Sequence, residues 1–546
     1  MKKQIRASHA LQLISLATCS LLISCNADAA VRVKIRPDGV SQECTVALQK
    51  WVFDRPELRQ KLAGARYRIL STVFQSQLPE KESYFENASE NYDRTQCFEQ
   101  AFQIDVYDYT SDRLLEISGN FLKTHELKIR QSSDQPAATP DEFAEAVEIV
   151  RSHPDFSGTQ AHWKPYEAMP PILKQGRNRV VPVGLFPKDP SFDHEIVGVN
   201  LSTLKVIRYP TGAPPTALAE ITACAPPSAN QSNTARGTAG QATITVQDGA
   251  TELWKFRVTR PSVSSGRWGS AIDLRDIFYK GKRVLSQLHT PILNVLYDQN
   301  LCGPYRDWQY SENPFQAVGT LMAPGILQAS EKPSTLLDSL VDRGNFRGIA
   351  VYTELDETVL VTELAAGWYR YKAEFRFHKD GTLKPRWGFA AIQDSCTCNR
   401  HHHHGYWRMD FDIGSGANTA EYFDGTQWNP VSTEARFHRD ATHQKWRISE
   451  AASGTKYEIE AGLTDGTADV YGKGDTWILK YMNGQIDDSR FYRNTSINID
   501  AFDTNQNVFN TDLIFWYGVH FTHTSDDTRH SFETVGPTIR PVTPTP

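Results

Sequence analysis

The sequence lacks an excess of basic charge and, beyond its first 30 residues, lacks any long hydrophobic run. Its 546 residues carry 58 Lys and Arg against 64 Asp and Glu, a formal net charge of −6. Because nucleic-acid-binding proteins normally carry a basic patch that neutralises phosphates, this balance argues against such a partner. No later stretch reaches the ~18 consecutive apolar residues of a membrane-spanning helix. With 40% hydrophobic residues, the chain reads as globular, with about three domains at roughly 100–200 residues each.

The first 30 residues predict an export signal. Basic residues at positions 2, 3 and 6 precede an apolar run over residues 10–23, which is too short to span a membrane. Two cleavage sites remain open: residues 22–25 (LISC) resemble a lipobox that would leave a lipidated Cys25, and residues 27–29 (ADA) fit ordinary signal peptidase. The signal thus occupies residues 1–29 or ends before Cys25. We expect a protein of the Gram-negative periplasm, or an outer-membrane lipoprotein whose membrane contact is that lipid.

Cysteine is scarce, with eight residues in the whole chain. Two of them belong to the signal and its end, so six remain in an exported, oxidising setting where structural disulfides are expected. Their pairing stays open, although Cys44 with Cys97 is the natural local bridge. The spacing of Cys396 and Cys398 fits a metal site, a strained pair or two halves of separate bridges.

Two small α+β domains are predicted before the main domain. The first spans residues 31–135 and combines a helix-like stretch near 46–62 with alternating strand-like segments. The second spans residues 136–210 and begins with a helix whose start is marked by Thr139 as N-cap, a following proline and Glu142 at the third helical position. No residues with evident chemistry lie in either domain.

A linker and a large β domain complete the expected architecture. Residues 211–241 are rich in Pro, Ala, Ser, Thr and Gly, which is typical of linkers. Residues 242–546 contain aromatic-rich alternating segments separated by turn signals such as Asp380-Gly381. The predicted fold class is therefore two small α+β domains followed by a large antiparallel β-sandwich that carries the chemistry.

Four consecutive histidines lead into one of the predicted strands. Odd positions along this strand are apolar and even positions are mainly polar, so His401 and His403 should point together into the interior. Two imidazoles at i and i+2 can hold one copper, zinc, iron or nickel ion. A loop of surface histidines is the alternative. A third ligand is offered by His520 or His523, which follow a very apolar run.

The two histidine segments together resemble those of copper amine oxidases. An R-hydrophobic-D-x-D motif follows the histidines at residues 408–412, and an N-T-D, W-Y and T-H pattern runs from residue 510 to residue 523. The resemblance implies copper bound by His401, His403 and His523. It also implies a peripheral site for Ca²⁺ or a similar hard cation, formed by the carboxylates of Asp410, Asp412 and Asp512 and the carbonyls of Phe411 and Leu513.

The resemblance further implies an organic cofactor, topaquinone, made from a tyrosine. Residues 377–382 fit the F-x-x-D-G-T motif that follows the precursor strand, and counting back places Tyr369 at the precursor position. The alternation of this strand puts Tyr369 on the apolar face. The flanks differ from the family pattern, because Trp368 stands where Asn is expected and Arg370 where an acidic residue is expected.

An amine oxidase also needs a base that removes a proton from the carbon next to the substrate nitrogen. Alignment on Gly319-Thr320-Leu321 places Glu312 at the family's base position. A competing register would place Gln316 there and remove the base. Tyr297 resembles the family tyrosine that hydrogen-bonds the cofactor oxygen, and its spacing favours Glu312.

The resemblance implies an exported homodimer that oxidises a primary amine with dioxygen. The products would be an aldehyde, ammonia and hydrogen peroxide, with copper and the quinone from Tyr369 as cofactors. Two alternatives remain open. A relative without quinone could serve as a copper-binding protein at the cell envelope, or a different copper oxidase could use Tyr369 unmodified or cross-linked through Cys396 or Cys398.

Overall fold

The fold is described from a computed structural model. It covers residues 31–37, 42–74, 101–120, 127–132, 138–167, 179–188, 195–208, 240–260, 272–297, 305–306, 311–366, 369–392, 397, 400–440, 443–469, 473–482, 499–523 and 534–542. The predicted signal, Cys25, Cys97 and nearly all of the predicted linker lie outside these ranges. None of the helices inside them is long and apolar enough to cross a membrane.

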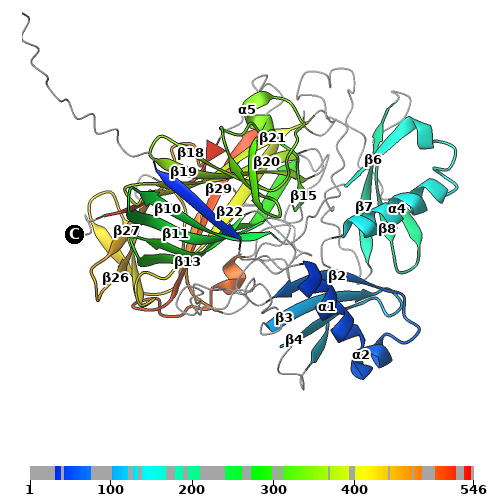
Figure 1. Cartoon of the computed structure of the whole chain (residues 1–546). Helices are drawn as coiled ribbons and strands as arrows, with labels where there is room; N and C mark the ends of the chain where they lie inside the picture. Colours follow the sequence, from blue (N-terminus) through cyan, green and yellow to red (C-terminus); the bar gives the residue numbers. More distant parts are fainter. Residues whose placement is uncertain are drawn as a thin grey trace, which may run out of the picture.

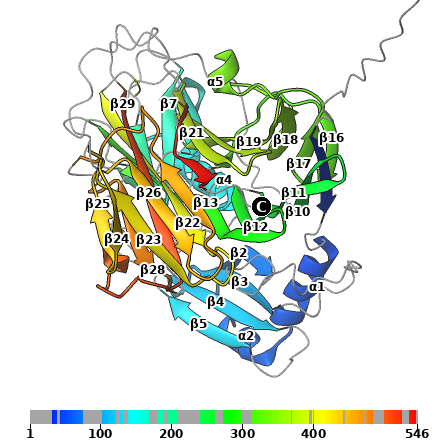
Figure 2. The same ribbon diagram turned by 90° about the vertical axis from the view of Figure 1, so that its left-hand side faces the viewer.

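Two large, mainly antiparallel sheets dominate the described residues. The first sheet has the strand order β1-β10-β11-β12-β13-β22-β29-β28-β25, with β14 paired to β13. Its strands are β1 (Arg32–Pro37), β10 (Gln241–Asp248), β11 (Thr251–Thr259), β12 (Asp273–Tyr279), β13 (Lys282–Tyr297), β14 (Tyr305–Arg306), β22 (His401–Phe411), β25 (Ala435–Phe437), β28 (Thr476–Lys480) and β29 (Leu513–His523). We call it the histidine sheet because β22 and β29 carry the histidines; Figure 2 shows both strands in it.

The second sheet, which we call the tyrosine sheet, contains Tyr369. Its strand order is β16-β17-β18-β19-β20-β21-β31-β27-β26-β23-β24, with β15 paired to β19 and β30 to β21. Its strands are β15 (Ser311–Glu312), β16 (Gly319–Ala323), β17 (Ile326–Ala329), β18 (Ile349–Glu354), β19 (Glu357–Ala366), β20 (Tyr369–His378), β21 (Leu383–Ala391), β23 (Asn418–Phe423), β24 (Trp428–Val431), β26 (Lys445–Glu450), β27 (Lys456–Glu460), β30 (Thr534–Val535) and β31 (Thr538–Pro541). Two short helices, α5 (Leu336–Ser339) and η8 (Ile499–Phe502), lie in the connections.

The two sheets bury their apolar faces against each other, as the β-sandwich prediction requires. One continuous core cluster contains residues of both, and the rings of Phe256 and Phe377 stack across it with centroids 4.1 Å apart. Trp254 packs edge-on against Phe377 at 5.1 Å. In a β-sandwich, apolar residues facing inward alternate along each strand with polar residues facing outward, and the inward residues of the two sheets form the core.

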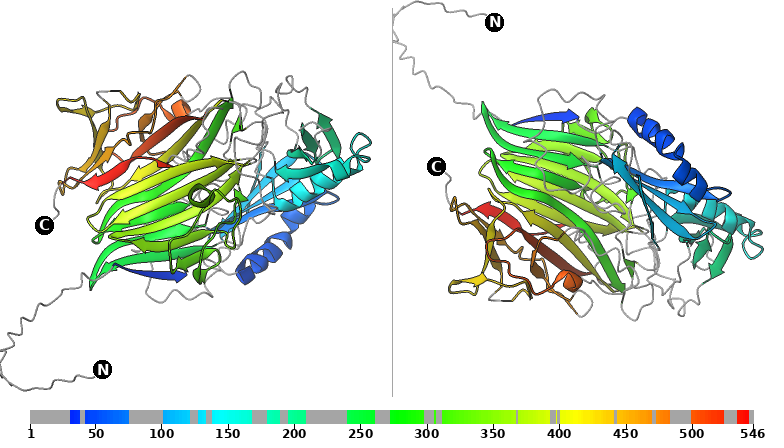
Figure 3. Two further views of the ribbon diagram at one scale, coloured as in Figure 1. Left: turned by 90° about the horizontal axis from the view of Figure 1, so that it is seen from above. Right: turned by 90° about the horizontal axis from the view of Figure 1, so that it is seen from below.

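Two small α+β modules lie beside the sandwich (Figure 1, Figure 3). The first has the sheet order β2-β3-β4-β5 and the second β6-β7-β8-β9. The first comprises α1 (Gln42–Phe53), α2 (Pro56–Lys61), β2 (Tyr67–Phe74), β3 (Ala101–Asp108), β4 (Arg113–Asn120) and β5 (Lys128–Ser132); the second comprises α4 (Pro140–Ser152), η3 (Gln160–His162), β6 (Trp163–Glu167), β7 (Val180–Pro187), β8 (Glu195–Asn200) and β9 (Lys205–Arg208). Cys44 on α1 is disulfide-bonded; its pairing with Cys97 stays a prediction.

The start of the first predicted domain belongs elsewhere in the fold. Strand β1 pairs antiparallel with β10, with Arg32 opposite Gln247, so residues 32–37 form the edge of the histidine sheet. The prediction that the small domain begins at residue 31 is wrong for this strand. Its partner is more than 200 residues away along the chain, and local sequence patterns carry no information about such pairings.

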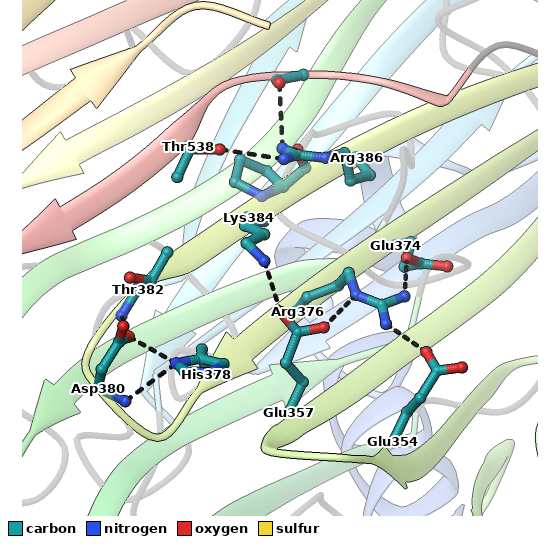
Figure 4. Close-up of polar contacts among 12 residues, drawn as sticks. Glu354, Glu357, Glu374, Arg376, His378, Asp380, Thr382, Lys384, Arg386 and Thr538 are labelled. Atoms are coloured by element: carbon teal, nitrogen blue, oxygen red, sulfur yellow. Dashed lines mark hydrogen bonds and ion pairs between the residues drawn. The ribbon is translucent and has the colours of Figure 1, made fainter.

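The outer face of the tyrosine sheet is lined with ion pairs, as Figure 4 shows. The guanidinium of Arg376 donates to Glu357 at 2.6 Å, to Glu374 at 2.7 Å and also to Glu354. The hydrogen bond from Arg376 is the main cause that lowers the pKa of Glu354. The β20–β21 hairpin then turns at Gly381, whose φ of +96° favours glycine.

A buried ion pair ties the two small modules together. The Arg179 guanidinium donates to both carboxylate oxygens of Glu142, at 2.8 and 2.7 Å, and the Tyr109 hydroxyl of the first module donates to Glu142 at 2.7 Å. Thr139 and Glu142 also form the predicted capping box of α4. Glu142 and Arg179 are almost completely buried, so neither charge can be solvated if its partner is removed.

We predict that Glu142→Gln destabilises the protein by about 3–5 kcal/mol, because Arg179 would keep a buried charge without its counterion. Urea unfolding followed by circular dichroism measures this. The matched control is Glu148→Gln in the same helix, where the exposed pair with Arg151 should contribute no more than ~0.5 kcal/mol. Equal losses in the two variants would contradict the prediction.

Candidate metal and tyrosine site

Three histidines gather on the inner face of the β22–β29 pair. The register places His401 directly opposite His523, and His403 lies two residues further along β22 on the same face. All three side chains are buried. The ring centroid of His401 lies 4.8 Å from that of His403 and 4.9 Å from that of His523. We refer to these residues as the inner histidine trio.

Tyr369 meets this trio from the opposing sheet. It is the first residue of β20, and its side chain is fully buried, on the face that the alternation predicts. Its ring centroid lies 4.7 Å from that of His403 and 5.3 Å from that of His401. The structure therefore brings together Tyr369 and the histidines at residues 401, 403 and 523.

The ring of His403 is held by its neighbours. The Tyr371 hydroxyl lies 3.3 Å from its Nδ1, and the mutually stacked rings of Phe389 and Phe521 lie 4.3 and 5.1 Å from it. Burial, and then the nearby histidines, lower the pKa of His403 well below its ordinary value. His403 is thus a neutral imidazole whose Nδ1 is engaged and whose buried Nε2 makes no hydrogen bond to another described residue, as suits a metal ligand.

The trio fits a copper ion in residue type and spacing. Its buried His401 Nε2, His403 Nε2 and His523 Nδ1 atoms make no hydrogen bond to another described residue. Two neighbouring imidazoles bound to one ion at about 2.0 Å have centroids about 4.5 Å apart at a 90° angle and about 5.2 Å apart at the tetrahedral angle. The 4.8 and 4.9 Å spacings of the trio lie between these values. Within the described ranges, no three His, Cys, Asp or Glu side chains already stand in metal-ligating geometry, so binding would require the rings to reorient.

The two candidate base positions have opposite environments. Glu312 is buried and its carboxylate accepts two hydrogen bonds from the Arg260 guanidinium, at 2.6 and 2.5 Å. Gln316 is exposed at the surface. Strand pairing places Glu312 opposite Leu364, which in turn lies opposite Tyr371, so two strand spacings, or about 10 Å of backbone, separate Glu312 from Tyr371.

The sequence matches no family model and no curated protein, whereas its fold is similar to solved amine oxidases. A copper-containing benzylamine oxidase from Hansenula polymorpha has a TM-score of 0.59 at 13% identity, covering 93% of this chain and 97% of that one. An amine oxidase from Aspergillus nidulans has a TM-score of 0.56 at 14% identity, over 93% and 88% of the two chains. A lysyl oxidase from Pichia pastoris has 0.56 at 12%, over 94% and 90%. The chain has the copper amine oxidase fold.

Two further site residues predicted from the copper amine oxidase resemblance are only partly described. The backbone of Tyr297 at the end of β13 pairs with that of His401, which places this residue beside the trio in register. Its side chain lies outside the described part of the structure, as does all of Trp368. Their roles stay predictions.

The carboxylates predicted to bind a peripheral cation have basic neighbours. The register places Phe411 opposite Leu513, with Asp410 and Asp412 on either side of Phe411. Asp412 accepts a hydrogen bond from Arg283 at 3.0 Å, and Arg408 lies 3.6 Å from Asp410. The described residues, including Asp512, form no preassembled metal group. This cation site also stays a prediction.

Arg370, which stands where the amine oxidase pattern has an acidic residue, forms a buried network. It donates to both carboxylate oxygens of Asp342, at 2.8 and 3.1 Å, and to the carbonyl of Tyr369 at 2.9 Å. The Asn313 amide bridges Asp342 at 3.0 Å and Glu363 at 2.5 Å. Position 370 thus carries a positive charge where the amine oxidase pattern has a negative one, and Asp342 is its buried counterion. The Arg370–Asp342 pair fixes the backbone that carries Tyr369.

Sequence reasoning missed Asp342, Asn313 and Glu363. They come from three segments joined only by the fold, and no spacing or alternation distinguishes them from surface residues. Burial raises the pKa of Glu363 to about 7, although hydrogen bonds from the Leu336 amide and from Asn313 oppose this. Glu363 therefore holds a proton in the folded protein over a pH range in which it loses that proton in the unfolded chain.

We predict that Glu363→Gln changes how stability depends on pH. The folded pKa is raised above the ordinary value of 4.5, so the stability that protonated Glu363 contributes is complete below pH 4.5 and is lost as the pH rises through about 7. The wild type should thus lose about 3 kcal/mol relative to the variant between pH 4.5 and 7.5. Urea unfolding at several pH values measures this, with the exposed Glu252→Gln as control. A pH-independent difference would contradict the assignment.

Proposed function

We propose that this protein is a copper-dependent oxidase that deaminates a primary amine with dioxygen, using a topaquinone formed from Tyr369. The observation that carries the proposal is the position of the Tyr369 ring, 4.7 and 5.3 Å from the His403 and His401 rings in a buried place between two sheets. The copper amine oxidase fold supports it. An export signal and a homodimer complete the hypothesis and stay predictions.

Each residue of the site would have a defined task. His401, His403 and His523 would hold copper, which with dioxygen supplies the one-electron chemistry for converting Tyr369 and later for reoxidising it. Tyr371 positions His403 through its Nδ1, so that Nε2 remains directed toward the ion. Phe389 and Phe521, which stack on each other 4.4 Å apart, pack together against this ring and exclude water from that side of it.

Glu312 is the proposed proton acceptor, and Arg260 restrains it. A general base must come within hydrogen-bond reach of the substrate carbon's proton. Both carboxylate oxygens of Glu312 already accept hydrogen bonds from Arg260, so accepting a proton would require Glu312 to exchange one of them. Because the Arg260–Glu312 ion pair occupies the candidate base, it favours a second candidate function. In that function the protein binds copper with this fold, and Tyr369 is not converted.

Mass spectrometry of the peptide containing Tyr369 distinguishes the two functions. The protein is loaded with copper in air, treated with phenylhydrazine and digested, with Tyr369→Phe and His401→Ala as parallel samples. We expect a tyrosine changed by two added oxygens and two lost hydrogens, carrying a hydrazine adduct, in the wild type and in neither of these two variants. Tyr371→Phe should retain the modification but bind copper roughly 10–100-fold more weakly, because His403 loses its positioning partner.

Copper content provides the control for each outcome. Bound copper with an unmodified Tyr369 peptide would reject the amine oxidase proposal and leave the copper-binding function. Absence of copper binding in the folded wild type would reject both. Folding of each variant is checked by circular dichroism.

A further inference from the structure

The β22–β29 pair presents histidines on its outer face as well as its inner one. Because successive side chains of a strand alternate, His402 and His404 point away from the inner trio. The register places His404 directly opposite His520, which comes from the same apolar segment as His523. His404 and His520 are both buried, and their ring centroids lie 5.1 Å apart. We refer to them as the outer histidine pair.

Each ring of the outer pair turns one nitrogen toward its partner and the other toward a carboxylate. The two Nδ1 atoms lie 2.8 Å apart. His520 Nε2 lies 3.0 Å from Asp475 Oδ1, and His404 Nε2 lies 3.7 Å from Asp469 Oδ1.

The carboxylate facing His520 is fixed by the backbone. Asp475 is fully buried and accepts hydrogen bonds from the backbone amides of Arg439 and Ala468, each at 2.6 Å. The carboxylate oxygen 3.0 Å from Nε2 favours the tautomer in which His520 carries its proton on Nε2, leaving a lone pair on Nδ1.

The geometry resembles two metal ligands with their supporting carboxylates. Two ligands at about 2.0 Å from one ion are separated by about 2.8 Å at the 90° angle of square-planar geometry and by about 3.3 Å at the tetrahedral angle. The 2.8 Å between the two Nδ1 atoms matches the square-planar value, and a tetrahedral ion would need them about 0.5 Å further apart. Histidines that bind metals usually donate their other ring N–H to a carboxylate. His520 Nε2 is within reach of Asp475, whereas the 3.7 Å between His404 Nε2 and Asp469 allows only a charge interaction.

We propose that the Nδ1 atoms of His404 and His520 bind a second metal ion of the Zn²⁺ or Cu²⁺ class, separate from the ion of the inner trio. Neutral imidazole is a preferred ligand of these ions. Two protein ligands leave coordination positions for water or a small anion. The proposal does not depend on any activity of the inner site.

The test is a titration of the metal-free full-length protein with Zn²⁺ by isothermal calorimetry. We expect two ions per chain in the wild type, one in His520→Asn and one in His523→Ala, which removes an inner ligand. His443→Asn is the matched control, since His443 also faces a carboxylate, 3.0 Å away on Asp440, but has no facing imidazole nitrogen at ligand distance in the described structure. It should still bind two ions.

A second variant guards against a folding defect in His520→Asn. Asp469→Asn removes a partly exposed negative charge 3.7 Å from His404 Nε2, so it should fold normally and weaken the outer ion roughly 10-fold without affecting the inner one. Equal Zn²⁺ stoichiometries for the wild type and a folded His520→Asn variant would overturn the proposal, whatever the inner trio binds. The outer pair would then be joined by an N–H···N hydrogen bond only.

Discussion

The pairing of β22 with β29 is the constraint on which the candidate site depends. Its register runs without interruption from His401 opposite His523 to Phe411 opposite Leu513. A slip of one residue would transfer every side chain of one strand to the opposite face of the sheet. The apolar residues that follow the histidines prevent this slip, because they must remain in the core. Packing energy therefore determines which histidines face inward.

The second requirement is the opposing sheet, which supplies Tyr369. β20 has an apolar inner face and a charged outer face, so the core fixes its orientation in the same way. On the outer face, the Arg370–Asp342 pair and the three carboxylates around Arg376 stabilise the sheet from behind. A ring placed between two rigid sheets can keep a fixed distance to the inner trio, as a reaction between a bound ion and Tyr369 requires.

The sequence was informative where a pattern is local. Alternation along two strands placed His401, His403 and Tyr369 on buried faces, and the Asp380-Gly381 turn signal matched the β20–β21 hairpin. It was uninformative where contacts join distant segments. The pairing of β1 with β10, the Arg260–Glu312 ion pair and the network around Glu363 connect residues with no common motif. The resemblance to copper amine oxidases predicted some long-range contacts, because a family pattern carries information about the fold.

Diffraction data collected at the copper absorption edge would test the central claim, that the inner trio binds copper beside Tyr369. The crystal would contain protein loaded with one equivalent of Cu²⁺ per chain. The account predicts one strong anomalous peak about 2.0 Å from Nε2 of His401, Nε2 of His403 and Nδ1 of His523. A principal peak at any other position, with the His401 and His403 rings still in contact with Tyr369, would contradict it.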